Sequence, residues 1–199
     1  FQPLQTTIAQ NPDAQTQYES NSYTSLDFYF ARAYAADHPD EDVLIVRNAV
    51  GGTGFQNNNW NDGDVLDLNV TPYLQAALAQ VSGEYATIEF GGILWHQGEA
   101  DANASEVYEA NLVALVARHR GYVEAEIANS SAPFICGTMV SRWIEERSFN
   151  TVVDAVHRNI ANLVPNADFV DLSDLDQEGW SLTNHFLVDE YKTIGARYY

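Results

Sequence analysis

Short hydrophobic runs alternate along the chain with longer segments in which apolar residues recur at helical spacing. The short runs are rich in β-branched and aromatic residues and are bounded by turn formers, which is typical of buried strands; they are residues 42–50, 85–95, 132–140 and 167–173. The periodic segments predict helices at 23–40, 70–83, 105–127, 146–164 and 186–199. This alternation predicts an α/β fold with a parallel sheet that helices cover on both faces.

Glycines and polar side chains follow two of the predicted strands. The run at 42–50 leads into "GGTG" (51–54), and the run at 85–95 leads into "HQGE" (96–99). The carboxyl ends of parallel strands meet at one edge of the sheet, where open α/β folds bind their ligands. We therefore expect the two loops to lie together there. The segment "SLTNHF" precedes the last helix, and we expect it to bring His185 to the same edge.

The two loops carry candidate donors for an oxyanion hole. Gly51 and Gly52 let the backbone approach a ligand closely and present an N–H group to it, and the Gln97 amide is a second donor at the next strand end. A developing oxyanion needs such donors fixed in advance. The alternatives are an ordinary tight turn for the two glycines, and an amide that satisfies local backbone groups for Gln97.

His185 is the candidate general base, because a loop before a terminal helix can hold its ring over the strand ends. The alternative is a surface histidine. Glu99 and Asp101 are candidates for catalysis, for holding the loop or for capping the next helix. His96 and Glu99 have a spacing that would suit a metal pair, but the sequence has neither an HExxH motif nor a second ligand set. We expect no metal and no cofactor.

Composition and charge limit the classes of molecule that the protein can bind. The 199 residues suit a single domain, 1–199, and the net charge is −19, with one lysine. Repulsion from phosphate disfavours nucleic acid and anionic membranes as partners. No apolar stretch is long enough to cross a bilayer, so we expect no membrane insertion. The acidic surface suits an extracellular or secreted protein, with a virion or cell surface as the alternative location.

Three segments taken together resemble a known family. "NAVGGTGF", "ILWHQGEADA" and "NHF…IGAR" are similar, in this order, to the second, third and last conserved blocks of the SGNH hydrolases, in the branch of sialate O-acetylesterases and plant-type carbohydrate acetyl esterases. The similarity runs from about Leu26 to Arg197, and "WHQGEAD" is its most specific element. The resemblance implies a flavodoxin-like, three-layer α/β/α sandwich that removes O-acetyl groups from sugars without a cofactor.

The resemblance also implies roles for individual residues. In the family a serine attacks the ester carbonyl and a histidine, here His185, takes its proton. The oxyanion is held by the serine N–H, by a glycine N–H that corresponds to Gly52 or Gly51, and by an amide that corresponds to Gln97. The remaining polar residues of the motif, His96 and Glu99, are assigned supporting roles.

The family's first block, Gly-Gln-Ser-Asn after a hydrophobic strand, has no counterpart in the sequence. Ser20 precedes an asparagine, but no apolar strand comes before it. The strand that carries this block is central in a sheet of order 2-1-3-4-5 and should lie between strands 43–49 and 87–95. We therefore expect an upstream segment or a companion chain to supply the missing strand and the nucleophilic serine. Direct hydrogen bonding between 43–49 and 87–95 would contradict this expectation.

A second departure concerns the partner of the histidine. The family usually has aspartate three residues before it, where the carboxylate orients the ring, but this chain has Leu182 there. The candidate replacements for orienting His185 are Asp176 and a backbone carbonyl. A Ser–His dyad without that carboxylate can still be active, because much of the rate gain comes from the oxyanion hole and from positioning.

Two functions from different classes follow. The first is a carbohydrate O-acetylesterase acting on an acetylated sugar, with Trp60 as a candidate for stacking on the sugar ring or, alternatively, as a packing residue. The second is an inactive SGNH-like module that binds carbohydrate or serves a structural role in a surface or virion assembly. The absent serine and aspartate fit the second function, whereas Gly51-Gly52, Gln97 and His185 favour the first.

Overall fold

The computed structural model describes residues 25–128, 131–175 and 185–199. Its centre is a parallel sheet of three strands, β1 (Ile93–Trp95), β2 (Phe134–Gly137) and β3 (Ala167–Val170), in the order β1-β2-β3. Trp95 pairs with Cys136, and Cys136 pairs with Phe169. The three strands therefore run in one direction, and their carboxyl ends share one edge.

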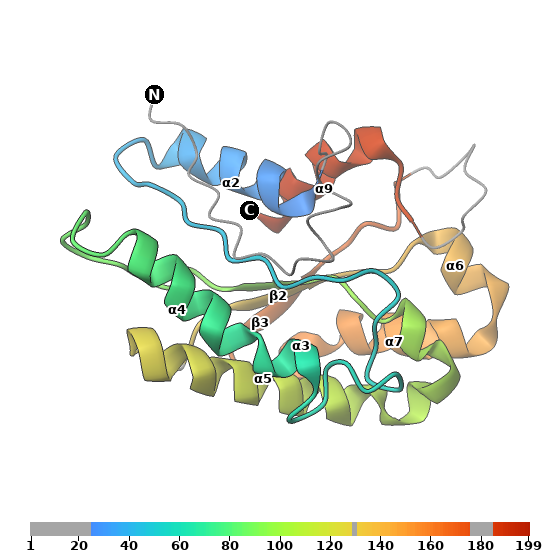
Figure 1. Cartoon of the computed structure of the whole chain (residues 1–199). Coiled ribbons are helices and arrows are strands. Elements are labelled where there is room, and N and C mark those ends of the chain that lie inside the picture. The colour runs from blue at the N-terminus through green and yellow to red at the C-terminus, as the bar shows by residue number, and fades with distance from the viewer. Residues whose placement is uncertain (1–24, 129–130, 176–184) are drawn as a thin grey trace.

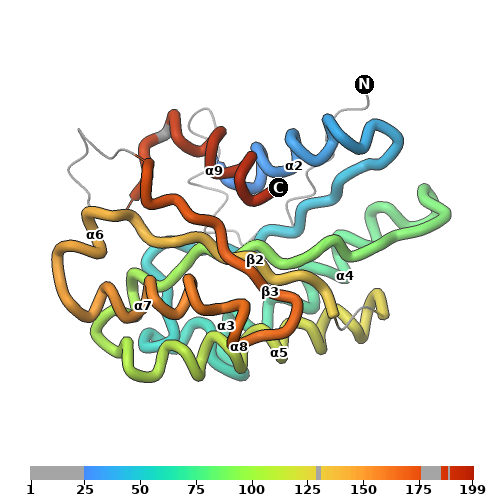
Figure 2. The backbone as a smooth tube through the Cα atoms, turned by 180° about the vertical axis from the view of Figure 1, so that it is seen from behind, coloured from blue at the N-terminus to red at the C-terminus, as the bar shows by residue number. Residues whose placement is uncertain are grey.

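Helices cover both faces of this sheet. α2 and α9 lie together on one face, and α3, α4, α5 and α7 lie on the other (Figure 1, and from behind in Figure 2). The helices are α2 (Leu26–Asp37), α3 (Val65–Leu68), α4 (Val70–Gln80), α5 (Ser105–Ile127), α6 (Ser141–Glu146), α7 (Ser148–Arg158), α8 (Ile160–Leu163) and α9 (Tyr191–Tyr198), with short 3-10 turns η1 (Glu99–Ala104) and η2 (Val188–Glu190). The three-layer α/β/α sandwich expected from the sequence is confirmed.

The core explains why the long helix forms where its pattern predicts it. On α5, the side chains of Tyr108, Leu112, Leu115 and Val116 recur on one face, and all are 0% exposed. A stripe of this kind directs the helix onto the sheet. The same hydrophobic cluster takes in Trp95 of β1 and residues of β2 and α7, so the packing of α5 fixes the strand ends that precede the candidate site. No helix in the described residues is long and apolar enough to span a membrane.

Two of the predicted strands differ from the structure. The strand predicted at 42–50 is wrong: these residues form no strand, and most of them are only half-buried. The strand predicted at 85–95 is reduced to β1, because 82–89 are exposed and pairing begins where the Ile93 amide donates to the Pro133 carbonyl (2.8 Å). An apolar run forms a strand only where a neighbouring strand supplies hydrogen-bond partners.

The helix predicted at 146–164 is two helices in the structure, α7 and α8, and α6, which ends at Glu146, precedes them. Arg147, between α6 and α7, has an extended backbone with φ −152° and ψ 143°, which ends one helix and begins the next. Within the predicted range, the break lies at Asn159, which has φ −100° and ψ 1°; apolar spacing continues through it, so periodicity alone did not reveal it.

The expected gap in the sheet is not contradicted. In the described ranges, no strand pairing joins 43–49 to 87–95, and β1 is hydrogen-bonded to β2. That an additional strand lies beside β1 stays a prediction. Ser20 lies outside the described residues.

Arg120, on the buried face of α5, joins the two loops that enter β2 and β3. Its guanidinium donates hydrogen bonds to the carbonyls of Ala132, Pro165 and Asn166, each at 2.9 Å. The side chain is 9% exposed, and burial lowers its pKa below the usual arginine value. One planar donor group thus satisfies three carbonyls at the amino end of the sheet, opposite the candidate site.

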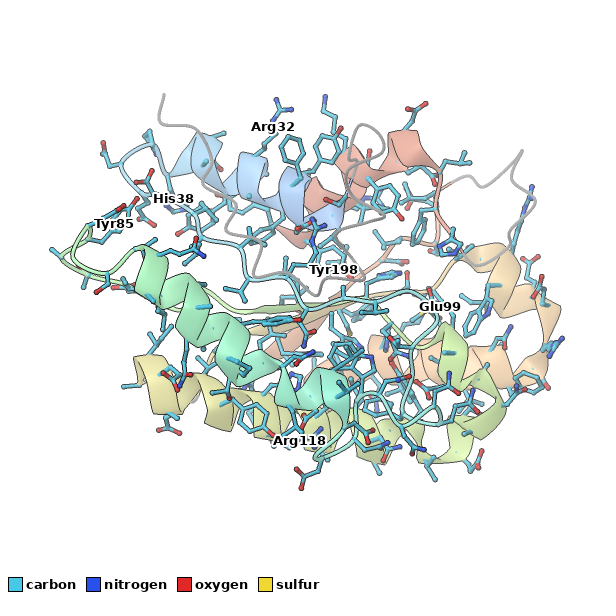
Figure 3. All side chains as sticks on the ribbon, in the orientation of Figure 1. Arg32, His38, Tyr85, Glu99, Arg118 and Tyr198 are labelled. Carbon is cyan, nitrogen blue, oxygen red and sulfur yellow. The ribbon has the colours of Figure 1, made fainter. Side chains whose placement is uncertain are left out.

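Replacing Arg120 with alanine is expected to lower the free energy of unfolding by about 3 kcal/mol, because three carbonyls lose a donor at on the order of 1 kcal/mol each. Urea denaturation measures this difference. Arg32→Ala, on the exposed face of α2 (Figure 3), is the control and should cost less than about 0.5 kcal/mol. Equal losses in the two variants would show that the three hydrogen bonds do not stabilise the sheet.

Candidate active site

The Gln97 amide links the two strand-end loops that the sequence singles out. Its Nε2 atom donates to the Thr53 carbonyl (3.0 Å) and to Oδ2 of Asp101 (2.7 Å). Thr53 directly follows Gly51-Gly52, so one side chain after β1 holds the glycine loop in place. The two loops therefore lie together at the carboxyl edge of the sheet, as expected.

Asp101 completes this connection, and we call the contacts of Gln97 and Asp101 with the glycine loop the amide clamp. Asp101 is 1% exposed, and its Oδ1 accepts a hydrogen bond from the backbone N–H of Gln56 (2.9 Å). The glycine loop presses closely on this carboxylate, since a Cβ added at Gly54 would lie 2.8 Å from Oδ1. Of the three candidate roles for Asp101, the hydrogen bonds support that of holding the loop.

The clamp bears directly on the predicted oxyanion hole. Both hydrogens of the Gln97 amide are donated, to Thr53 and Asp101, whereas its Oε1 is buried and has no hydrogen-bond partner among the described residues. Gly51 and Gly52 form an exposed turn, and Gly52 has φ +74°, a conformation that favours glycine. A role for these three residues at an oxyanion stays a prediction. In this structure, the exposed turn offers backbone N–H groups more readily than Gln97 offers its amide.

Trp60 is a packing residue. It is 4% exposed, its indole donates to the Thr53 hydroxyl (3.0 Å), and its ring meets Trp95 edge to face at 5.2 Å. A ring that stacks on a sugar needs at least one face open to solvent. The Trp60 ring is too enclosed to offer such a face. The burial therefore favours the packing role for Trp60, and sugar stacking by this residue stays a prediction.

His185 lies near the polar end of β1. It is exposed; its charge adds to the burial that lowers the pKa of His96 and opposes the burial that raises the pKa of Glu99, so the three groups are electrostatic neighbours. The next residue, Phe186, is 5% exposed and packs edge-on against the His96 ring at 5.5 Å. This buried phenylalanine anchors the end of the loop that carries His185. The structure thus brings residue 185 to the edge predicted for it.

His96 is held by a hydrogen-bond chain that reaches the last helix. Tyr198, on α9, donates its hydroxyl to the Trp95 carbonyl (3.0 Å), and Nδ1 of His96 lies 3.0 Å from the same hydroxyl oxygen. Because the tyrosine hydrogen is already donated, Nδ1 must carry a proton and donate. Burial, and secondarily His185, lower the pKa of His96 to about 4, so the ring is neutral at pH 7. Figure 3 shows Tyr198 between α9 and the sheet.

Glu99 is the carboxyl group beside these histidines. It opens η1 at the carboxyl edge of the sheet (Figure 3). Burial raises its pKa, while the backbone N–H groups of Glu99 and Gly98, together with His157 and His185, act in the opposite direction. A carboxylate in this place can stabilise a positive charge on His185. Asp176 and Leu182, which the sequence analysis also considered, lie outside the described residues.

Sequence reasoning missed Tyr198, Tyr108 and His157 as parts of the site. The Tyr108 hydroxyl donates to the Gln97 carbonyl (2.7 Å), and His157 lies behind it. Each is an aromatic or polar residue inside a helix, with no local signal that its polar atom faces a strand end. In the portions of the chain that the structure describes, no group of three or more His, Cys, Asp or Glu side chains could hold a metal ion.

The layers and the polar edge define a three-layer α/β protein with a candidate acyl-transfer site at the carboxyl ends of its strands. The chain belongs to the SASA family, described as carbohydrate esterase, sialic acid-specific acetylesterase, which it matches over residues 2–199. The membership expected from "WHQGEAD" and its companion segments is thereby confirmed. A comparison with curated protein sequences gives no match.

Solved structures share the fold. A protein from Arabidopsis thaliana has a TM-score of 0.67 at 20% identity, over 84% of this chain and 63% of its own length. NanS has a TM-score of 0.69 at 20% identity, over 85% of this chain and 67% of its own. A carbohydrate acetylesterase from Xanthomonas citri has a TM-score of 0.59 at 16% identity, over 89% and 40%. The chain thus spans under two thirds of the Arabidopsis protein.

The clamp predicts an energetic coupling between Gln97 and Asp101. Asp101→Ala is expected to lower the free energy of unfolding by about 3 kcal/mol, because two hydrogen bonds to a carboxylate are lost at roughly 1.5 kcal/mol each. In a double-mutant cycle with Gln97→Ala, the loss should fall short of the sum by about 1–2 kcal/mol. Urea denaturation of the four proteins measures the cycle.

The control for this cycle is Asp174→Ala, which removes an exposed ion pair with Arg197 and should change stability by less than about 1 kcal/mol. Additive losses for Gln97→Ala and Asp101→Ala would mean that the two side chains stabilise the fold independently.

Proposed function

We propose that the protein is a carbohydrate O-acetylesterase that hydrolyses acetyl esters on sugars by a serine–histidine mechanism. Family membership supports the reaction class. The observation that carries the proposal is the meeting of three segments: the Gln97 amide bonds the loop after Gly52, and His185 lies in the electrostatic neighbourhood of Glu99. The nucleophilic serine comes from a segment upstream of residue 1 or from a companion chain, which also adds a strand beside β1.

His185 acts as the general base. The serine hydroxyl gives its proton to the imidazole while its oxygen bonds to the ester carbonyl carbon. The tetrahedral intermediate then collapses, the sugar oxygen leaves with the proton from His185, and an acetyl-serine remains. Water repeats the sequence, again giving its proton to His185, and releases acetate. The exposed position of His185 suits this exchange with substrate and water.

The oxyanion is held mainly by backbone donors. The N–H of Gly52, in an exposed turn with φ +74°, and the N–H of the serine stabilise the negative oxygen. The Gln97 amide becomes a third donor by turning one hydrogen away from Thr53. Its bond to Thr53 (3.0 Å) is longer than its charge-assisted bond to Asp101 (2.7 Å), so the Thr53 bond is the one to exchange.

Glu99 stabilises the imidazolium that His185 becomes. The aspartate three residues before the histidine is absent from the sequence, and the charge of His185 opposes the burial that raises the pKa of Glu99, which supports Glu99 as its carboxyl partner. The His96 ring, which is hydrogen-bonded to Tyr198, packs against Phe186, the residue that follows His185. The net charge of −19 suits a neutral sugar substrate and, as part of the same proposal, an extracellular location.

Replacing His185 with alanine in the complete protein should lower kcat for a chromogenic acetate ester by about 10²- to 10⁴-fold, because the serine loses its base. The matched control is His38→Ala, a partly exposed histidine at the end of α2, far from Glu99 in Figure 3. This control should leave kcat unchanged.

Equal kcat values for His185→Ala and the wild type would contradict the assignment of His185. An intact protein that binds acetylated sugars but releases no acetate would instead support the alternative, an inactive carbohydrate-binding module.

A further inference from the structure

A buried chain of hydrogen-bonding groups runs behind the candidate site, between the ends of two strands. The Tyr108 hydroxyl, on α5, lies 2.7 Å from the carbonyl oxygen of Gln97 and 2.8 Å from Nε2 of His157, on α7. Nδ1 of His157 lies 2.8 Å from the Gly137 carbonyl at the end of β2. Two side chains from two helices thus connect the residue after β1 with the last residue of β2.

The side chains of this hydrogen-bond chain are fully enclosed by protein. Tyr108 and His157 are both 0% exposed, so neither exchanges its partners with bulk water. The backbone at Gly98 lies directly on the tyrosine, since a Cβ added there would come within 3.0 Å of the hydroxyl oxygen. The peptide between Gln97 and Gly98 is therefore held on its carbonyl side by Tyr108. The N–H of Gly98, on the other side of this peptide, opposes the burial that raises the pKa of Glu99, so the Glu99 carboxyl lies near it.

The hydrogen-bond chain has one hydrogen fewer than it has contacts. Three contacts connect the four groups, but a neutral histidine and a tyrosine bring only two hydrogens. Burial lowers the pKa of His157 to about 4, so the ring is neutral at pH 7. If Tyr108 donates to Gln97, donation from Nδ1 of His157 to Gly137 would leave the lone pairs of Nε2 and of the tyrosine oxygen facing each other at 2.8 Å, so His157 donates through Nε2 and leaves Gly137 without its hydrogen. If His157 donates to Gly137, Tyr108 turns to His157 and releases Gln97.

We propose that Tyr108 and His157 are positioning residues of the active site. Through the tyrosine hydroxyl they fix the peptide between Gln97 and Gly98, and with it the Gln97 amide and the Glu99 carboxyl beside His185. The productive arrangement is the tautomer in which His157 donates from Nε2 and Tyr108 donates to Gln97. This inference rests on the proposed function for its kinetic consequences, but its structural part stands apart from it.

A loss of this positioning acts on the chemical step. Neither Tyr108 nor His157 is exposed, so neither contacts the sugar, and KM of Tyr108→Phe should stay within about twofold of the wild type. Its kcat should fall roughly 10- to 100-fold, because the Gln97 amide and the Glu99 carboxyl shift from their places. The control is Tyr122→Phe, on the same helix. That residue also loses a hydroxyl bonded to a buried carboxylate, Asp67 (2.9 Å), but away from the strand ends.

Two substitutions of His157 separate positioning from mere packing. Glutamine reaches the place of Nε2 and can donate to Tyr108, whereas asparagine reaches the place of Nδ1 and can donate only to Gly137. We expect His157→Gln to keep kcat within about threefold of the wild type, and His157→Asn to lose as much as Tyr108→Phe. A purely structural histidine would give equal kcat values in the two variants.

The closing experiment adds a measurement that needs no esterase activity, the ¹H–¹⁵N amide shift of Gly98. Tyr108→Phe should move this signal, and Tyr122→Phe should not. Movement in Tyr108→Phe alone, with no acetate ester hydrolysed by the wild type, would refute the proposed function and leave the positioning pair intact. An unmoved Gly98 signal, a KM effect without a kcat effect, or equal kcat losses in the Tyr108 and Tyr122 variants would overturn the pair.

Discussion

The donation of two hydrogen bonds by a single amide, that of Gln97, is the interaction on which the candidate site depends. Parallel strands bring their ends to one edge but do not fix the loops that follow. Gln97 fixes two of them, because its Nε2 bonds the Thr53 carbonyl and the buried Asp101 carboxylate. Asp101 in turn accepts a hydrogen bond from the backbone N–H of Gln56. Without this clamp, the glycine turn at 51–52 would have no defined position relative to the end of β1.

A second constraint brings the last helix to the same place. Tyr198 donates to the Trp95 carbonyl across 103 residues of sequence, and His96 donates to Tyr198. These groups meet over the end of β2, where any side chain at Gly137 would collide with them: a Cβ there would lie 2.8 Å from Nδ1 of His96. The absence of a side chain at position 137 thus lets α9 dock, and the docking of α9 sets where the segment with His185 begins.

The sequence predicted what depends on local pattern, and missed what depends on partners. α5 runs over the residues expected, 105–127, because its apolar stripe identifies both the helix and its buried face. The run at 42–50 is as apolar as a strand, but apolar character does not tell whether a neighbouring strand pairs with it. For Trp60, which follows a polar loop, the sequence left sugar stacking and packing both open; in the structure the Thr53 hydroxyl and Trp95 hold the ring inside. The meeting of the Gln97 loop with the glycine loop was expected from two parallel strand ends, but residues 42–50 form no strand, and the contact is made instead by the Gln97 hydrogen bonds to Thr53 O and Asp101 Oδ2.

The central claim is that the loops after Val50 and Trp95 and the ring of His185 surround a single acyl site. The most direct measurement is a crystal structure of the complete protein after reaction with a phosphonate ester, which forms a stable tetrahedral adduct on an activated serine. The account predicts one adduct, with its phosphoryl oxygen within hydrogen-bond distance of the Gly52 N–H and with His185 beside the serine oxygen. An adduct remote from Gly52 and Gln97, or none at all, would contradict it.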